Sequence, residues 1–145
     1  MDHLYADGSI PDGYTIDKDG WVFSPKNKPV GGVTVYNGIG KRTGTRSDVY
    51  LFKVAFTSKE KLYLTMGHEY VHVYLNYGGT TLDEVAQERV AYKWSMDQAN
   101  AWNMTKDASH YEKWYNYYLK QETRAPHPYG IPVDYLFKKK NPFKP

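Results

Sequence analysis

The chain of 145 residues carries a formal net charge of +3, and 17% of its side chains are aromatic. A chain of this length and aromatic content can bury a core, which excludes a disordered or low-complexity protein and indicates one domain. The chain contains no cysteine, which excludes a disulfide framework and any thiolate metal site. A bound metal would therefore need His and carboxylate ligands. Much of the positive charge lies in 137–145, "FKKKNPFKP", which is typical of a solvated tail, and we expect no nucleic-acid partner.

No apolar run has the length of a membrane span, and the first residues, "MDHLYADGSIPDG", lack the basic and apolar parts of a signal peptide. We therefore expect no membrane partner. The cellular location stays open, because the chain could remain where it is made or be exported as part of a larger secreted protein that carries the delivery signals.

The first third of the chain has the pattern of strands and loops. In 13–24, "GYTIDKDGWVFS", apolar ends flank Asp19-Gly20, which predicts a β-hairpin. The β-branched and aromatic runs 31–38 and 48–56 predict two further strands. Alternate residues of the second run would share one face: Tyr50, Phe52, Val54 and Phe56. The Gly-rich segment 37–47 lacks the spacing of a phosphate-binding loop, so it predicts a hairpin loop.

Three helices are predicted after the strands. Ser58 is a good N-cap for a helix that runs to about Asn76, where two glycines stop it. The second helix is expected over 82–102 and the third over 108–121, whereas the proline-containing segment 123–137 should be extended. Strands followed by helices indicate an α+β fold.

The segment 65–76, "TMGHEYVHVYLN", places His68 and His72 four residues apart in the first predicted helix. At about 100° per residue, the two side chains lie roughly 40° apart on one face. The helix is apolar nearly all round and should be buried, so a shared metal would satisfy one nitrogen of each imidazole. Glu69 would lie beside that metal and could take a proton from a water molecule without being a ligand. Two core histidines with a solvated glutamate are the alternative.

A third ligand is available on the second predicted helix. Glu84 and Glu88 lie one turn apart, and their stripe continues through small and apolar residues. Two buried carboxylates without a cation would be destabilising, so the pair favours a metal nearby. The alternative is that both glutamates are surface residues near a helix N-terminus, where acidic side chains are favoured.

"HEYVH" at 68–72, followed by a helix with "ERVAYKW" at 88–94, resembles the zincin metallopeptidases, specifically the glutamate-liganded gluzincins. The resemblance covers 58–104. It implies a zinc ion held by His68, His72 and a glutamate of the second helix. Glu88, in the setting Glu-x-x-Ala, is favoured, and Glu84 is the alternative third ligand.

Two other zincin patterns do not fit the chain. The metzincin pattern needs Gly at 75 and His at 78, where Leu75 and Gly78 stand. The aspartate-liganded pattern is spelled by 79–83, "GTTLD", but Asp83 would face away from the two glutamates and no Tyr-Gly follows.

The resemblance also implies an architecture and a reaction for the single domain 1–145. A small twisted sheet would cover the HExxH helix, which would pack against the second long helix, and the strand 48–56 would be the edge that pairs with a peptide or protein substrate. Glu69 would act as general base and then as general acid. The oxyanion would need a further donor, for which four residues are candidates: His110, Tyr111, His127 and Tyr129. Among them, the segment 127–129 is preferred.

The biological role is indicated only by general likeness. A small, cysteine-free HExxH domain is similar to the metallopeptidase toxin modules at the C-termini of Rhs-type polymorphic toxins. That likeness implies delivery by a larger secreted protein and a dedicated immunity protein as partner. The rival interpretation is a catalytically inactive zincin-like protein-binding module, whose contacts would come from the aromatic segment 110–120.

Overall fold

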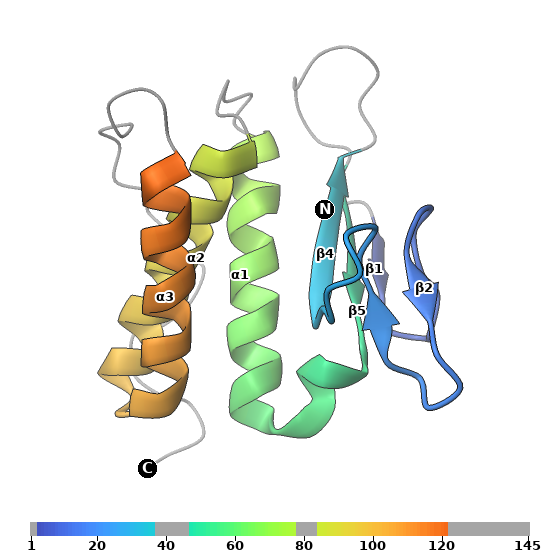
Figure 1. Cartoon of the computed structure of the whole chain (residues 1–145), viewed down its shortest axis with the longest axis horizontal. Coiled ribbons are helices and arrows are strands. Elements are labelled where there is room, and N and C mark those ends of the chain that lie inside the picture. The colour runs from blue at the N-terminus through green and yellow to red at the C-terminus, as the bar shows by residue number, and fades with distance from the viewer. Residues whose placement is uncertain (1–2, 37–46, 78–83, 122–145) are drawn as a thin grey trace. The chain divides into compact units, whose positions relative to one another are not determined.

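The protein is described by a computed structural model over residues 3–36, 47–77 and 84–121 (Figure 1). These residues form two small sheets and three α-helices, so the predicted α+β class is confirmed. The chain divides into two compact units, Met1–Thr80 and Thr81–Pro145. We call them the N-terminal and C-terminal units. The expectation of a single domain over 1–145 remains a prediction.

The predicted hairpin at Asp19-Gly20 is present in the N-terminal unit. Strands β2 (Thr15–Ile16) and β3 (Val22–Phe23) pair antiparallel. Asp17 closes the turn, since its Oδ1 accepts hydrogen bonds from the backbone N–H groups of Asp19 and Trp21, each at 2.9 Å. Gly20 has a φ of +88°, which a residue without a Cβ adopts at little cost.

The larger sheet of the N-terminal unit has the order β1-β5-β4 (Figure 1). Strand β5 (Ser47–Leu51) pairs in parallel with β1 (His3–Tyr5) and antiparallel with β4 (Gly32–Tyr36). The prediction that 48–56 supplies the edge strand is therefore wrong, because β5 is paired on both sides. Among the described residues, the edge strands of this sheet are β1 and β4.

The same segment also departs from the predicted alternation. The strand ends at Leu51, and Lys53–Thr57 forms a 3₁₀ helix, η1. The last sheet-like bond joins the N–H of Phe52 to the carbonyl of Gly31, just before β4 begins, and the N–H of Ala55 then turns back to the carbonyl of Phe52. Among the described residues, no strand pairs with the segment beyond that point, where it turns. Within β5 the buried residues are Ser47, Val49 and Leu51, so the face with Tyr50 is the less buried one.

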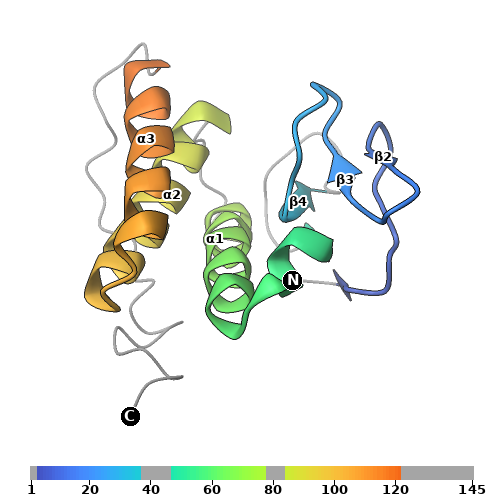
Figure 2. The same cartoon turned by 60° about the horizontal axis from the view of Figure 1, so that its bottom comes forward.

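Helix α1 (Lys59–Tyr77) confirms the first predicted helix. Ser58 caps it, because its Oγ accepts the N–H of Lys61 at 2.9 Å. The helix packs on β4 and β5, and Figures 1 and 2 show it beside β4. Near its end, the Nδ2 of Asn76 donates to the Oγ of Ser47 at 3.1 Å, and both side chains are buried. Its residues Leu64, Val71 and Leu75 are buried, whereas Leu62, Met66 and Val73 are half-buried, so the helix is not buried all round as predicted.

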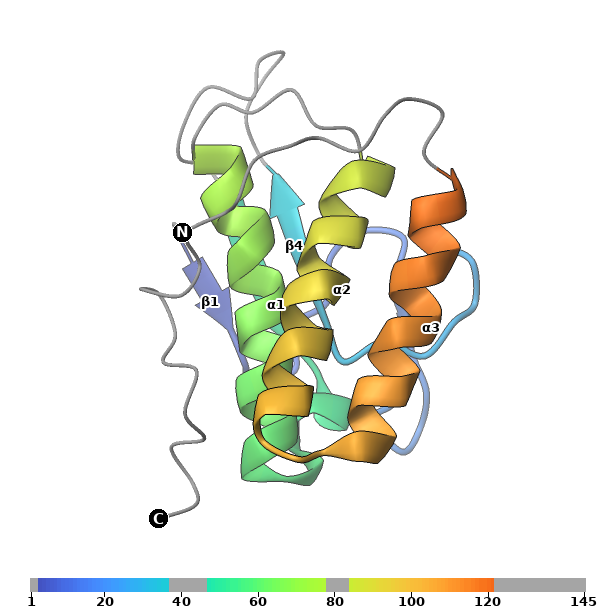
Figure 3. The ribbon, with the colours of Figure 1, turned by 90° about the vertical axis from the view of Figure 1, so that its left-hand side faces the viewer.

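The C-terminal unit contains α2 (Glu84–Ala101) and α3 (Thr105–Gln121), which pack side by side (Figure 3). Helix α2 ends in a Schellman motif, in which the N–H of Met104 bonds the carbonyl of Ala99 and the N–H of Asn103 bonds that of Asn100. Asn103 has a φ of +59°, as this motif requires. Both helices were predicted, and α3 begins three residues earlier than expected because this tight cap leaves little connecting chain.

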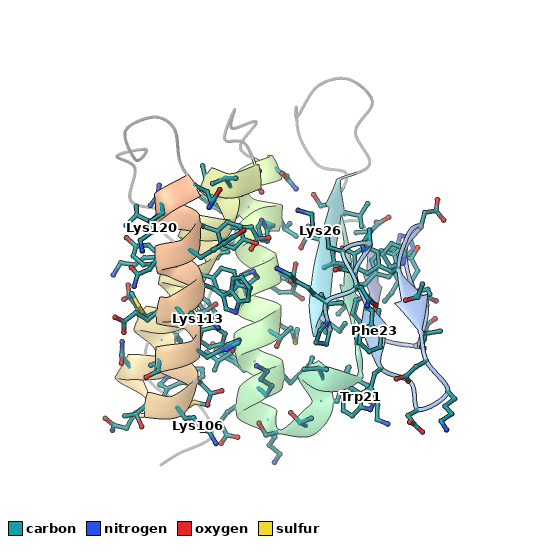
Figure 4. All side chains as sticks on the ribbon, viewed as in Figure 1. Trp21, Phe23, Lys26, Lys106, Lys113 and Lys120 are labelled. Carbon is teal, nitrogen blue, oxygen red and sulfur yellow. The ribbon has the colours of Figure 1, made fainter. Side chains whose placement is uncertain are left out.

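The two faces of α3 differ in chemistry. Tyr111 is buried, and Trp114 and Tyr118 stack near Tyr92 of α2 at 6.3 and 5.8 Å between ring centroids. Three lysines lie along the exposed side, seven residues apart: Lys106, Lys113 and Lys120 (Figure 4). None of the described helices is both long enough and apolar enough to cross a membrane.

Candidate functional site

The two histidines of the HExxH motif lie on successive turns of α1. Their ring centroids are 5.3 Å apart and the ring planes meet at 65°. His72 is 8% exposed, whereas His68 is half-buried. The pair therefore combines a largely enclosed imidazole with one that is partly open to solvent.

This spacing fits a shared zinc ion. Zinc binds imidazole nitrogen at about 2.0–2.1 Å in a tetrahedral arrangement, which would hold two ring centres roughly 5 Å apart. The observed 5.3 Å is close to that value. Imidazole nitrogen and carboxylate oxygen are also ligand types that zinc accepts, and the cysteine-free chain offers no thiolate donor.

Glu69 is not the solvated residue of the alternative interpretation. Its side chain is only 5% exposed. The hydroxyl of Thr34, on β4, donates to its Oε2 at 2.7 Å and also lies 3.0 Å from its backbone carbonyl oxygen. A hydrogen bond to a carboxylate at this distance is short and strong, so strand β4 fixes the side chain that follows His68.

Strand β4 approaches α1 closely at the same place. A Cβ built on Gly32 would lie 3.3 Å from Cγ of Glu69, 3.2 Å from Cγ2 of Thr65 and 3.1 Å from the carbonyl oxygen of Tyr50. These contacts are tighter than ordinary van der Waals distances, so a Cβ here would require its neighbours to shift. Glycine at 32 thus allows the strand to reach the helix at Glu69.

Glu88 lies in the C-terminal unit, on α2. Its side chain is half-buried, and its predicted stripe is buried, with Ala91, Ser95 and Ala99 fully enclosed. Glu84 is the first residue of α2, and its side chain lies outside the described part of the structure. Among the described residues, His68, His72 and Glu88 are a candidate metal-binding triad, and the residues do not identify the ion.

The four candidate oxyanion donors are placed differently. His110 is exposed on α3, whereas Tyr111 is buried beside Tyr92, with ring centroids 6.3 Å apart. Burial, with a smaller contribution from the charge of Asp107, raises the pKa of Tyr111 well above its ordinary value. Such a hydroxyl belongs to the core of its unit. His127 and Tyr129, the preferred candidates, lie outside the described residues.

No protein family model, curated protein or solved structure matches this chain.

Two residues of the site region were missed by sequence reasoning. Thr34 and Gly32 lie in a run that was correctly predicted as a strand, but no motif links them to Glu69, 35 and 37 positions along the chain. The available signal was the paired glycines of 31–32, which often mark a close approach of backbones in a strand.

Proposed function

We propose that this chain is a zinc-dependent endopeptidase of the zincin type. His68, His72 and Glu88 would hold the ion, with Glu84 as the alternative third ligand. The observation that carries the proposal is the state of Glu69: it is buried and held by Thr34, directly after the first histidine of a pair whose ring spacing suits zinc. A histidine pair of purely structural use gives no reason to bury the intervening carboxylate.

When bound, zinc would supply an acidified water molecule and a Lewis acid for the scissile carbonyl. The chain's own part is proton transfer and orientation. Glu69 takes the proton as the water oxygen attacks the carbonyl carbon, and then passes it to the amine as the C–N bond breaks. The two imidazoles must be neutral to act as ligands, so binding should weaken as the solution becomes acidic.

The strand that pairs with substrate cannot be the one predicted from the sequence, 48–56. Because β5 is central, it cannot accept a peptide at its edge. Strand β4 is the edge strand that carries Thr34, beside Glu69. An extended peptide paired with β4 would run close to the proton acceptor, so we propose β4 as the strand that pairs with substrate.

The decisive experiment is the substitution Glu69→Gln in the full chain. The amide oxygen can still accept the hydrogen bond from Thr34, so the fold and one zinc per chain should be retained. Cleavage should fall by roughly 10²–10⁴-fold, because an amide cannot take the proton. Elemental analysis, circular dichroism and hydrolysis of a quenched fluorescent peptide would measure the three properties. Full activity in this variant, or a wild-type chain that takes up no zinc, would reject the proposal.

The toxin role can be tested with the same pair of proteins. If the chain is the catalytic module of an exported toxin, expression of the wild type should harm cells and yield new cleavage fragments in lysates. The Glu69→Gln chain should do neither. Equal harm from both chains would show that the toxicity does not come from peptide hydrolysis. An immunity protein would then be sought among proteins that bind the chain.

The second candidate function is protein binding without catalysis, and the exposed side of α3 favours it. Lys106, Lys113 and Lys120 follow one another at intervals of seven residues, which is about 10.5 Å along the helix. The side chain of Tyr117, which is 46% exposed, lies among them. This basic stripe would suit an acidic protein surface. Replacing the three lysines by glutamate should abolish such binding while zinc content stays unchanged. Salt-insensitive binding that survives these substitutions would exclude the stripe.

A further inference from the structure

We propose that Thr34 is a positioning residue that holds the Glu69 side chain in place for proton transfer. This inference rests on the proposed function, in which Glu69 is the proton carrier. It adds a residue from strand β4 that lies outside the HExxH motif.

The first support is the distance of the contact. The Thr34 hydroxyl lies 2.7 Å from Oε2 of Glu69, within the range of hydrogen bonds to an ionised oxygen. The bond is part-buried, and Glu69 itself is 5% exposed, so water competes poorly for either partner. A general base must be held at a fixed distance from the atom that it deprotonates, because small displacements reduce rates steeply.

The second support is that the same hydroxyl has two acceptors and one proton. Its oxygen also lies 3.0 Å from the backbone carbonyl oxygen of Glu69. While the side chain is a carboxylate, the hydroxyl donates to Oε2. Because Thr34 engages Oε2, a proton from water would be taken by the other carboxylate oxygen, and Oε2 stays available as an acceptor for the Thr34 hydroxyl. The Thr34 hydroxyl thus lies against both the side chain and the backbone of Glu69, which restricts the rotamer of that side chain.

The third support is the tight packing around this contact. The Cβ position of Gly32 lies 3.3 Å from Cγ of Glu69 on the side of β4. The strand therefore holds the stem of the side chain while Thr34 holds its oxygen. Thr34 and Gly32 pair with Val49 and Leu51, two buried residues of the central strand, so they occupy a firmly anchored part of the sheet.

The test compares Thr34→Val with Thr34→Ser. Valine keeps the shape of the side chain and loses the hydroxyl, whereas serine restores the hydroxyl. In the zinc-loaded full chain, with a quenched fluorescent peptide that the wild type cleaves, Thr34→Val should lower kcat roughly 10–100-fold. KM and zinc affinity should change by less than about threefold, since the hydroxyl is proposed to contact neither metal nor substrate. Thr34→Ser should recover most of kcat.

Thr65→Val is the matched control for packing. Thr65 lies on α1, and its Cγ2 methyl would be 3.2 Å from a Cβ at Gly32, so the same substitution is made against the same strand position. It should leave kcat within about twofold of wild type. An equal loss of kcat in Thr65→Val and Thr34→Val would assign the effect to packing and overturn the inference.

A measurement without turnover separates this inference from the proposed function. The infrared difference between the wild type and Glu69→Gln isolates the carboxylate band of Glu69. The same difference taken in the Thr34→Val background should show a shifted band, because the carboxylate has lost its hydrogen bond. An unshifted band, or unchanged kcat in an active Thr34→Val enzyme, overturns the inference alone. A wild type without zinc or hydrolysis overturns the proposed function, while the band still decides whether Thr34 holds Glu69.

Discussion

The neighbouring residues Gly31 and Gly32 offer a sharp test of how β4 is fitted against α1. Neither has a positive φ, so alanine is compatible with the backbone at both positions. At Gly31 a new Cβ would meet its nearest atoms at 3.6 Å, which is ordinary contact. At Gly32 it would meet three atoms at 3.1 to 3.3 Å, one of them a backbone carbonyl oxygen of the adjoining strand.

The expected difference in the free energy of unfolding follows from these distances. Replacing glycine by alanine stabilises a protein by about 0.4–1 kcal/mol through the unfolded state, and this term is common to both variants. Forcing a methyl group into a packed site costs about 1–3 kcal/mol, and this term applies to Gly32→Ala alone. We therefore expect Gly31→Ala to equal or exceed wild-type stability and Gly32→Ala to be about 1–3 kcal/mol less stable than Gly31→Ala.

Urea unfolding followed by far-ultraviolet circular dichroism would measure the difference. The samples should contain a chelator, because a metal bound to the folded state would add its own stabilisation. Gly32→Ala should also lower any peptidase activity, since the methyl group would push on the Glu69 stem. Equal stability of the two variants would refute the close approach of β4 to Glu69 and weaken the role given to Thr34.

Three further predictions concern the metal and the core of the C-terminal unit. His68→Ala and His72→Ala should each lose zinc by elemental analysis, because a zinc site needs at least three good protein ligands; retention of a full equivalent in either would remove that residue from the site. In a competition assay with a zinc indicator, Glu88→Ala should weaken zinc binding more than Glu84→Ala. If Glu84 only supports a ligand, Glu84→Ala should lower the zinc affinity by roughly 10–100-fold or less. The reverse order would make Glu84 the ligand. Burial raises the pKa of Tyr111 above its ordinary 10.0, so this tyrosine loses its proton at a lower pH in the unfolded chain than in the folded one. The stabilising contribution of Tyr111 is therefore fully present below about pH 10 and declines as pH rises further. Tyr111→Phe should therefore flatten the fall of stability between pH 9 and 11 in thermal melts, and an unchanged fall would assign alkaline destabilisation to other groups.

The helices were predictable because their signals are local. The Ser58 hydroxyl that identified the start of α1 in the sequence makes the capping bond in the structure. The HExxH spacing placed both histidines on one side of α1, and burial of the stripe at Ala91 and Ser95 of α2 followed the helical period. In each case the residues that form the pattern and the residues that they contact or cap lie within a few helical turns of one another.

The sheet was less predictable because its pairing depends on distant residues. Alternation in 48–56 could not show that the strand would end at Leu51, since that depends on where β4 begins. Nor could it show which face α1 would cover, and the covered face turned out to carry Val49 rather than the aromatic Tyr50. The contact of Thr34 with Glu69 depends on the same pairing, so it was beyond the reach of motif reasoning.

The short strand β1 has a consequence for how the protein can be handled. It contributes three residues, yet it closes one side of the central strand, and Tyr5 stacks on Tyr50 with ring centroids 4.6 Å apart. Without β1, the backbone groups of β5 would form an open edge, and open edges of apolar strands recruit other chains. The remaining pair of strands would also be marginal as a sheet. Shortening the chain before Tyr5 therefore invites self-association into aggregates and leaves the HExxH helix on a weakened support.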